Sequence, residues 1–316
     1  MSLFLLRRTV VFAATLAGTS VVIFLVLDIL PGNAALTILG PDAPSDAVAA
    51  LSHKLGLDQP ALARYFAWIF GLLSGDLGVS YAYGTPVAEL ILGGLSVSLP
   101  LAVMAMALTA LIALSLGIFA ALRHNSLLDT GVMGMSQIGI AIPNFWFAIL
   151  LILLFAVRLR WFAAGGFPGW GDGALTALRA LILPAVALAV VQAAILARVT
   201  RSSIIEVMRE DFVRTARAKG LTRRAALWRH VLRNAMIPVV TIMGLQFANL
   251  IAGTVVIENV FYLPGLGRLI FQAINNRDLI VVRDCVMLLA AFVVAVNFAI
   301  DLVYVAIDPR LKVQAP

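Results

Sequence analysis

Few residues in this 316-residue chain have the types and spacing that covalent or metal chemistry requires. None of its lysines, Lys54, Lys219 and Lys312, follows the glycine pattern of a phosphate-binding loop. The three histidines lie far apart, without the spacing of metal ligands, and Cys285 has no second cysteine to pair with. The common hydrolase patterns G-x-S-x-G and H-E-x-x-H are absent as well. We therefore expect no catalysis, no metal site and no bound cofactor in this chain.

Uncharged amide side chains within long apolar stretches are the polar groups most suited to a function. An amide in hydrocarbon is costly, so these side chains must face protein or water. Two interpretations stay open: they line a hydrated pathway for a polar solute, or they form hydrogen bonds that hold a helix bundle together. Gln137 and Asn144 are seven residues apart, so one continuous helix places them on one face. The candidate pathway residues are Gln137, Asn144, Gln192, Gln246 and Asn249.

A basic stretch between two apolar ones, residues 202–236, is the second candidate and is called the elbow below. Two apolar stripes at helical spacing predict two helices that meet at Gly220, where a left-handed C-cap fits, with Thr222 as the next N-cap. Such a unit is a rigid projection that another protein can grip. The alternative is a basic helix lying on anionic lipid. The two stripes are Ile205, Met208, Phe212 and Ala216, then Trp228, Val231, Leu232 and Ala235.

The elements that must position these residues are membrane helices. The chain is 62% hydrophobic and 12% charged, with a mean hydropathy of +1.02, which is typical of an all-α protein that crosses a membrane several times. A span needs about 20 mostly apolar residues. Six stretches qualify, at roughly 9–30, 96–121, 133–157, 179–200, 237–257 and 284–306.

The net charge of +7 invites a nucleic-acid interpretation, but the basic residues gather in loops beside the apolar stretches. The positive-inside rule explains them better. It places Arg7-Arg8, 122–132, the elbow and the tail in the cytoplasm, with both termini on that side. The expected organisation is an N-terminal end and first span, 1–30, an extracytoplasmic segment, 31–95, a core with five spans and the elbow, 96–306, and a cytoplasmic tail, 307–316. The first apolar run is too long for a signal peptide, so we interpret it as a retained span.

The elbow resembles the coupling loop of ABC importer permeases, the so-called EAA loop, and most closely that of the dipeptide, oligopeptide and nickel permease family. Two runs carry the resemblance, RTARAKGL at 214–221 and LRNAMIP at 232–238. The glycine of the signature falls on Gly220. Its Glu-Ala-Ala falls on Arg214, Thr215 and Ala216, so only the last alanine is kept. Further runs extend the resemblance nearly end to end: GLDQP at 56–60, GDLG at 75–78, ENVFYLPGLGRL at 258–269 and DPRLK at 308–312.

This resemblance implies a type I ABC importer permease in a bacterial inner membrane. It implies a second, homologous permease subunit, two cytoplasmic ATPase subunits that bind ATP and Mg, and an extracytoplasmic substrate-binding protein, besides membrane lipid. The implied ATPase-coupling residues are Asp211, Arg214, Thr215, Ala216, Arg217, Ala218, Lys219, Gly220 and Leu221. The expected contacts with the binding protein are Asp76, Glu258, Pro264, Gly265 and Arg268.

The substrate is left open by the sequence. Di- or oligopeptides come first, nickel or a nickel chelate second, and glutathione or another small solute third. A different class of protein is a secondary transporter or channel that works alone. Such a chain should show inverted repeats or charges embedded in its spans, and neither is clear here.

Overall fold

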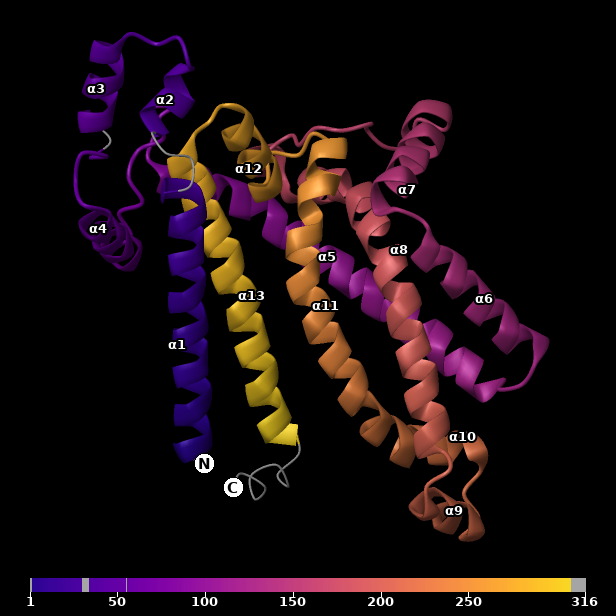
Figure 1. The fold of residues 1–316 in the computed structure, drawn as a ribbon. Helices are drawn as coiled ribbons and strands as arrows, with labels where there is room; N and C mark the ends of the chain where they lie inside the picture. Colours follow the sequence, from indigo (N-terminus) through magenta and orange to yellow (C-terminus); the bar gives the residue numbers. More distant parts are fainter. Residues whose placement is uncertain (1, 30–33, 55, 308–316) are drawn as a thin grey trace. The chain divides into compact units, whose positions relative to one another are not determined.

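The computed structural model describes residues 2–29, 34–54 and 56–307 (Figure 1). The expected tail, 307–316, lies outside the described residues except for its first position. All named elements of the described part are helices, accompanied by one isolated bridge between Val79 and Pro86. The chain divides into two compact units. The first unit is Met1–Ser98 with Pro264–Phe298, and the second unit is Leu99–Leu263 with Ala299–Pro316.

The first unit is built on three long helices and the segment between the first two. Its core gathers around Val87, Ile91, Leu266, Ile270 and Val281, and a second cluster joins Trp68 to Ile23 and Phe24. Its helices are α1 (Ser2–Phe24) with a π-helical end (Leu25–Ile29), α2 (Ala34–Leu39), α3 (Ser45–Lys54), α4 (Ala61–Ser74), the start of α5 (Val87–Leu122), α12 (Leu266–Asn275) and most of α13 (Leu279–Ile307).

The second unit is organised around α8 (Ala174–Val207), which packs against α6 (Leu127–Ala141), α7 (Asn144–Leu151) and α11 (Leu232–Val260). Small residues line the buried side of α8, so neighbouring backbones approach closely. A Cβ on Gly117 of α5, for example, would lie 2.6 Å from Cβ of Thr200. The remaining elements are a π-helix (Ile152–Arg158), a 3-10 turn (Trp170–Asp172), α9 (Asp211–Ala218), α10 (Arg223–Ala226) and a π-helix (Leu227–Val231).

The all-α, multispan prediction is confirmed. Within the described residues, five helices are long and apolar enough to cross a membrane: Leu6–Leu27, Val87–Leu122, Ala174–Val207, Arg223–Val260 and Leu279–Ile300. A sixth span exists if a bent pair, Leu127–Ala141 with Asn144–Arg158, counts as one.

The expected third span, 133–157, is not the continuous helix that its composition suggested. Its two halves meet at 100°. Ile142 is extended, with φ −82° and ψ 124°, and Pro143 starts the second half. Proline lacks the N–H that would continue the helix, and it disfavours helical geometry in the residue before it. Gln137 and Asn144 therefore lie on different helices, and the expectation that they share one face is wrong.

Candidate functional site

The turn inside the elbow has the geometry that the sequence predicts. Gly220 has φ +93°, and it follows α9 directly after the C-cap residue Lys219. The amide of Gly220 donates to the carbonyl of Arg217 at 3.0 Å, and the amide of Leu221 donates to that of Ala216 at 3.3 Å. These two bonds define a Schellman motif, which satisfies carbonyls that the end of a helix leaves open.

The next helix begins where the sequence predicts. Thr222 is the N-cap of α10, and its hydroxyl accepts a hydrogen bond from the amide of Ala225 at 3.2 Å. From Arg223 the chain stays helical through the π segment Leu227–Val231 and into α11, with Pro238 inside that helix. The second arm of the elbow is therefore continuous with the fifth span, so a displacement of the turn acts directly on that span.

Most residues of the two apolar stripes pack together as one core cluster, including Ile205, Met208, Val231, Leu232 and Ala235. The first arm is broken, because α8 ends at Val207 and α9 starts at Asp211. Two members of the stripes, Phe212 and Trp228, are exposed. Val213, Ala226 and Leu227, which are not members of the predicted stripes, are fully buried.

The exposed side of α9 holds most of the residues that the resemblance assigns to ATPase coupling. Ala216 is buried and Leu221 is half-buried, so these two anchor the turn. An ion pair on this surface joins Arg214 to Asp211 at 3.4 Å, and both side chains are largely exposed. An exposed pair of this kind adds little stability, which leaves the surface free to bind a partner. The exposed members are Asp211, Arg214, Thr215, Arg217, Ala218, Lys219 and Gly220.

The base of the elbow is closed by direct contact between its two arms. The hydroxyl of Ser203 on α8 donates to the carbonyl of Ala235 on α11 at 2.8 Å, and this bond is buried. Around it, Ile204, Val213, Leu227 and Val231 form one core cluster. The two arms of the elbow are therefore fastened to each other at its base.

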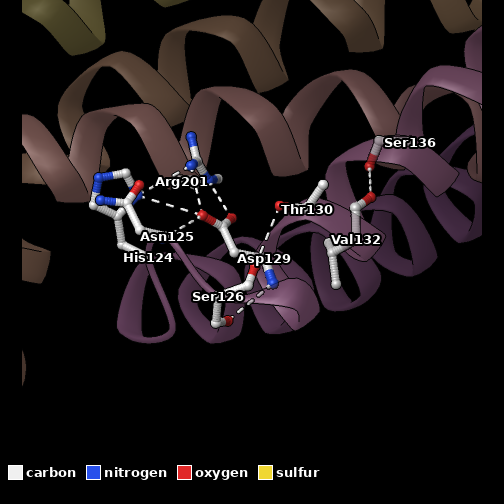
Figure 2. A network of polar contacts seen from close by, with 8 residues as sticks. All are labelled: His124, Asn125, Ser126, Asp129, Thr130, Val132, Ser136 and Arg201. Carbon is white, nitrogen blue, oxygen red and sulfur yellow. Dashed lines mark hydrogen bonds and ion pairs between the residues drawn. The ribbon is translucent and has the colours of Figure 1, made fainter.

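One side chain just before the elbow reaches another helix (Figure 2). Arg201 on α8 donates from Nε to Oδ1 of Asp129 at 2.5 Å and from Nη2 to Oδ2 at 2.7 Å. Asp129 lies in the first turn of α6 and is 3% exposed. The amide of Asn125 donates to the same carboxylate at 3.1 Å, and Nδ1 of His124 lies 3.3 Å from it. A two-point contact with a buried carboxylate is geometrically specific, because the guanidinium fork fits it in one orientation.

We call Arg201 and Asp129 the clamp. The clamp was not predicted from the sequence, although a pattern around Asp129 was present there. Ser126 caps α6 and accepts from the amide of Asp129 at 3.3 Å, as a Ser-x-x-Asp run predicts. No local sequence pattern indicated Arg201 as the partner of Asp129. Beside the clamp lies an open cleft of about 470 Å³, lined by His124, Arg201, Glu206, Arg209 and Asp211 among others. Among the described residues, no three His, Cys, Asp or Glu side chains are placed to hold a metal ion.

The candidate pathway amides fall into two groups. Gln246 is buried, and its Nε2 donates to the backbone carbonyl of Gln192 on α8 at 3.1 Å. That bond links α11 to α8, as the bundle interpretation expects. Asn249 is exposed and lies within a stripe of α11 that also exposes Leu245, Ala252 and Val256. Since an exposed amide in lipid is costly, this stripe must meet protein or water.

The other two amides lie on either side of the bend between α6 and α7. Gln137 on α6 is exposed, and its Oε1 accepts a hydrogen bond from Arg198 of α8 at 2.5 Å. Asn144 is half-buried at the first position of α7. The structure therefore does not gather the five amides on one surface, and the pathway role stays a prediction for each of them.

The residues expected to contact the binding protein also differ from one another in their exposure. Asp76 and Pro264 are exposed and Arg268 is half-buried, whereas Gly265 and Glu258 are buried. Glu258 is 0% exposed, so its side chain is not available to a docking protein. The short helix α12 follows the Pro-Gly turn, and its first amide, that of Leu266, donates to the hydroxyl of Ser98 at 2.8 Å.

The fold is that of the membrane subunits of type I ABC importers. A structure described as the MetNI methionine ABC transporter in inward-facing conformations matches with a TM-score of 0.57 and 18% identity, over 70% of this chain and 97% of that chain. A crystal structure of an amino acid ABC transporter with histidines matches with a TM-score of 0.52 and 17% identity, over 68% and 93% of the two chains.

The chain belongs to the binding-protein-dependent transport system inner membrane components. The model of that family matches residues 113–313, and the model of its N-terminal part matches residues 1–102. Among its relatives, a putative peptide transport system permease protein of Brucella abortus is 41% identical over 99% of both chains. The oligopeptide transport system permease protein AppB of Bacillus subtilis is 36% identical over 99% of this chain and 100% of the relative. This protein is therefore a multi-pass, inner-membrane permease subunit.

Proposed function

We propose that this chain forms half of the translocation pathway of an ATP-driven importer for di- or oligopeptides. The observation that carries the proposal is the end-to-end relation to peptide permeases, at 41% identity over 99% of the chain. The dipeptide transport system permease protein DppB of Alkalihalophilus pseudofirmus, 36% identical over 97% of this chain, supports the same substrate class. These relatives favour peptides over nickel, a nickel chelate or glutathione.

The proposed assembly contains a second permease subunit, two cytoplasmic ATPase subunits and an extracytoplasmic binding protein. ATP and Mg bind to the ATPase subunits, because this chain has no phosphate-binding loop. In this arrangement both termini and the elbow are cytoplasmic. Support comes from the exposed, largely polar side of α9, which offers a partner protein a surface on a fastened base.

We further propose how ATP-driven closure moves the spans. A push on α9 displaces the Schellman turn at Gly220 and, through the continuous helix that follows, the fifth span. The clamp between Arg201 and Asp129 carries the same displacement into α6, which leads to the bend at Pro143. The elbow is thus the lever, and the pathway opens or closes as α6, α8 and α11 move together.

The test is transport by the complete assembly in proteoliposomes, with the binding protein outside and ATP inside. We expect uptake of labelled di- and tripeptides that requires both ATP and the binding protein. Uptake of nickel without peptides would overturn the substrate class. Uptake by this chain alone, driven by an ion gradient, would show a secondary transporter instead.

A further inference from the structure

We propose that α4, within the segment 31–95, is embedded in the outer leaflet of the membrane. Its exposed face is covered by lipid acyl chains rather than by water or by another protein. We call this face the outer face of α4, and it consists of Leu62, Phe66, Phe70 and Leu73. This helix belongs to the segment that the sequence assigns to the extracytoplasmic side, and its placement in lipid is independent of the substrate.

The helix α4 is apolar on two opposite sides. Its inner side, with Tyr65, Trp68, Ile69 and Leu72, packs against α1 and α13 in one cluster with Ile23 and Phe24. Its outer face recurs at intervals of four, four and three residues, as one stripe of a helix does. These side chains are 73%, 53%, 67% and 80% exposed at Leu62, Phe66, Phe70 and Leu73.

The outer face carries no charged side chain, whereas the water-exposed face of a helix does. The other exposed residues of α4 are Ala61, Ala63, Ala67 and, at the very end, Ser74. Arg64 is half-buried, with its guanidinium carbon 5.9 Å from the ring centre of Phe24. The neighbouring helix α3 provides the contrast, because it exposes Ser45, Asp46 and His53. Of these two helices, α4 has the surface of a helix that lies in lipid.

The contacts of α4 also place it at membrane depth. The hydroxyl of Tyr65 lies 2.8 Å from the hydroxyl of Ser20 on α1, within hydrogen-bonding distance. Ser20 lies inside the apolar span Leu6–Leu27, about 10 Å before its end at 1.5 Å per residue. Figure 1 shows α4 beside this upper part of α1 and crosswise to it. The level of the contact is therefore that of hydrocarbon, whose total thickness is about 30 Å.

The inner side of α4 is fastened to the spans by polar contacts. Nε1 of Trp68 donates to Oδ1 of Asp284 on α13 at 2.7 Å, and this bond is buried. The guanidinium of Arg283 lies 4.8 Å from the ring centre of Trp68. These polar contacts join the inner side of α4 to the spans, and the outer face takes no part in them.

Lipid is favoured over a protein partner because the membrane span that α4 packs against also exposes apolar side chains at this level. At the same level of α1, the side chains of Val21, Val22, Leu25 and Val26 are exposed. A binding protein arrives through water and leaves again, which would return four large apolar side chains to water in each cycle. An amphipathic helix in the interface avoids this exposure.

The experiment uses the assembled importer in proteoliposomes, with Cys285→Ser removing the single natural cysteine. Spin labels are attached at Phe66→Cys and Phe70→Cys. The matched controls are Ala49→Cys on α3 for water and Val22→Cys on α1 for lipid, both at exposed positions. Collision rates are measured with oxygen, which concentrates in lipid, and with chromium oxalate, which stays in water.

We expect the oxygen-to-oxalate ratio at Phe66→Cys and Phe70→Cys to match that of Val22→Cys and to exceed that of Ala49→Cys several-fold. A ratio equal to that of Ala49→Cys would overturn the proposal in favour of a water-exposed cap. Protection from both reagents that ends when the binding protein is removed would overturn it in favour of a protein interface. Protection that persists without the binding protein, together with cross-linking between copies, would identify a second copy as the occupant and would also overturn it.

Discussion

Arg201 holds Asp129 at two points, with Nε donating to Oδ1 at 2.5 Å and Nη2 donating to Oδ2 at 2.7 Å, across 72 residues of sequence. The contact joins the last turns of α8, directly before the elbow, to the first turn of α6. Because the carboxylate is buried, the two helices cannot separate here without leaving a charge unpaired in the protein interior.

The first prediction follows from that clamp. Asp129→Asn leaves the half-buried guanidinium without its charged partner, so we expect a stability loss of about 1–3 kcal/mol. Peptide uptake should fall more than ATP hydrolysis, because the elbow then moves without carrying α6. Thermal unfolding and the ratio of peptide transported to ATP hydrolysed measure the two effects.

The matched variant for the clamp is Arg201→Lys, which keeps the charge and removes the two-point fork. Its thermal stability and its ratio of peptide transported to ATP hydrolysed should both lie between those of the natural protein and of Asp129→Asn. An unchanged ratio of transport to hydrolysis in both variants would show that the clamp only stabilises the fold.

The second prediction concerns Gly220, which has φ +93°. A Cβ at this position would meet nothing within 4 Å, so the effect of a substitution comes from the backbone conformation alone. For Gly220→Val we expect about 1–2 kcal/mol of strain and uncoupled ATP hydrolysis in a normally inserted protein. Gly220→Asn is the control, since asparagine tolerates left-handed geometry. Equal coupling in the two variants would contradict the proposed role of the turn.

The third prediction separates the expected binding-protein contacts by their exposure. Cysteines at Asp76 and Pro264, both exposed, should cross-link to the binding protein during transport. A cysteine at Glu258, which is fully buried, should not. Cross-linking yields in the Cys285→Ser background measure this. If neither exposed position cross-links, this part of the surface does not contact the binding protein and only shields the external side.

The fourth prediction separates the amides of α11. Asn249→Cys should react with a membrane-impermeant thiol reagent at a rate that changes with the ATP state, because its side chain is exposed. Gln246→Cys should be protected in every state, and Gln246→Leu should lower stability by about 0.5–1.5 kcal/mol through loss of one hydrogen bond. Transport should be far less sensitive to Gln246→Leu than to Asn249→Leu. Constant protection at position 249 would remove Asn249 from the pathway.

Local features of the elbow and of the spans were predictable. Apolar stretches of sufficient length indicate spans from composition alone, because hydrocarbon solvates no charge. The Schellman turn at Gly220 and the cap at Thr222 were predictable because each depends on backbone geometry within a few residues. The bend at Ile142 and Pro143 was equally local, but the predominantly apolar composition of residues 133–157 suggested one continuous span.

Contacts between distant residues were decided only by the tertiary structure. No periodicity pairs Arg201 with Asp129, or Tyr65 of α4 with Ser20 of α1, because such a contact depends on how whole helices pack. The same holds for burial within one helix, where Gln246 faces α8 and Asn249, three residues later, is exposed. Composition determined that this chain lies in a membrane, and packing decided which of its polar side chains fasten the bundle and which are left for a partner or a solute.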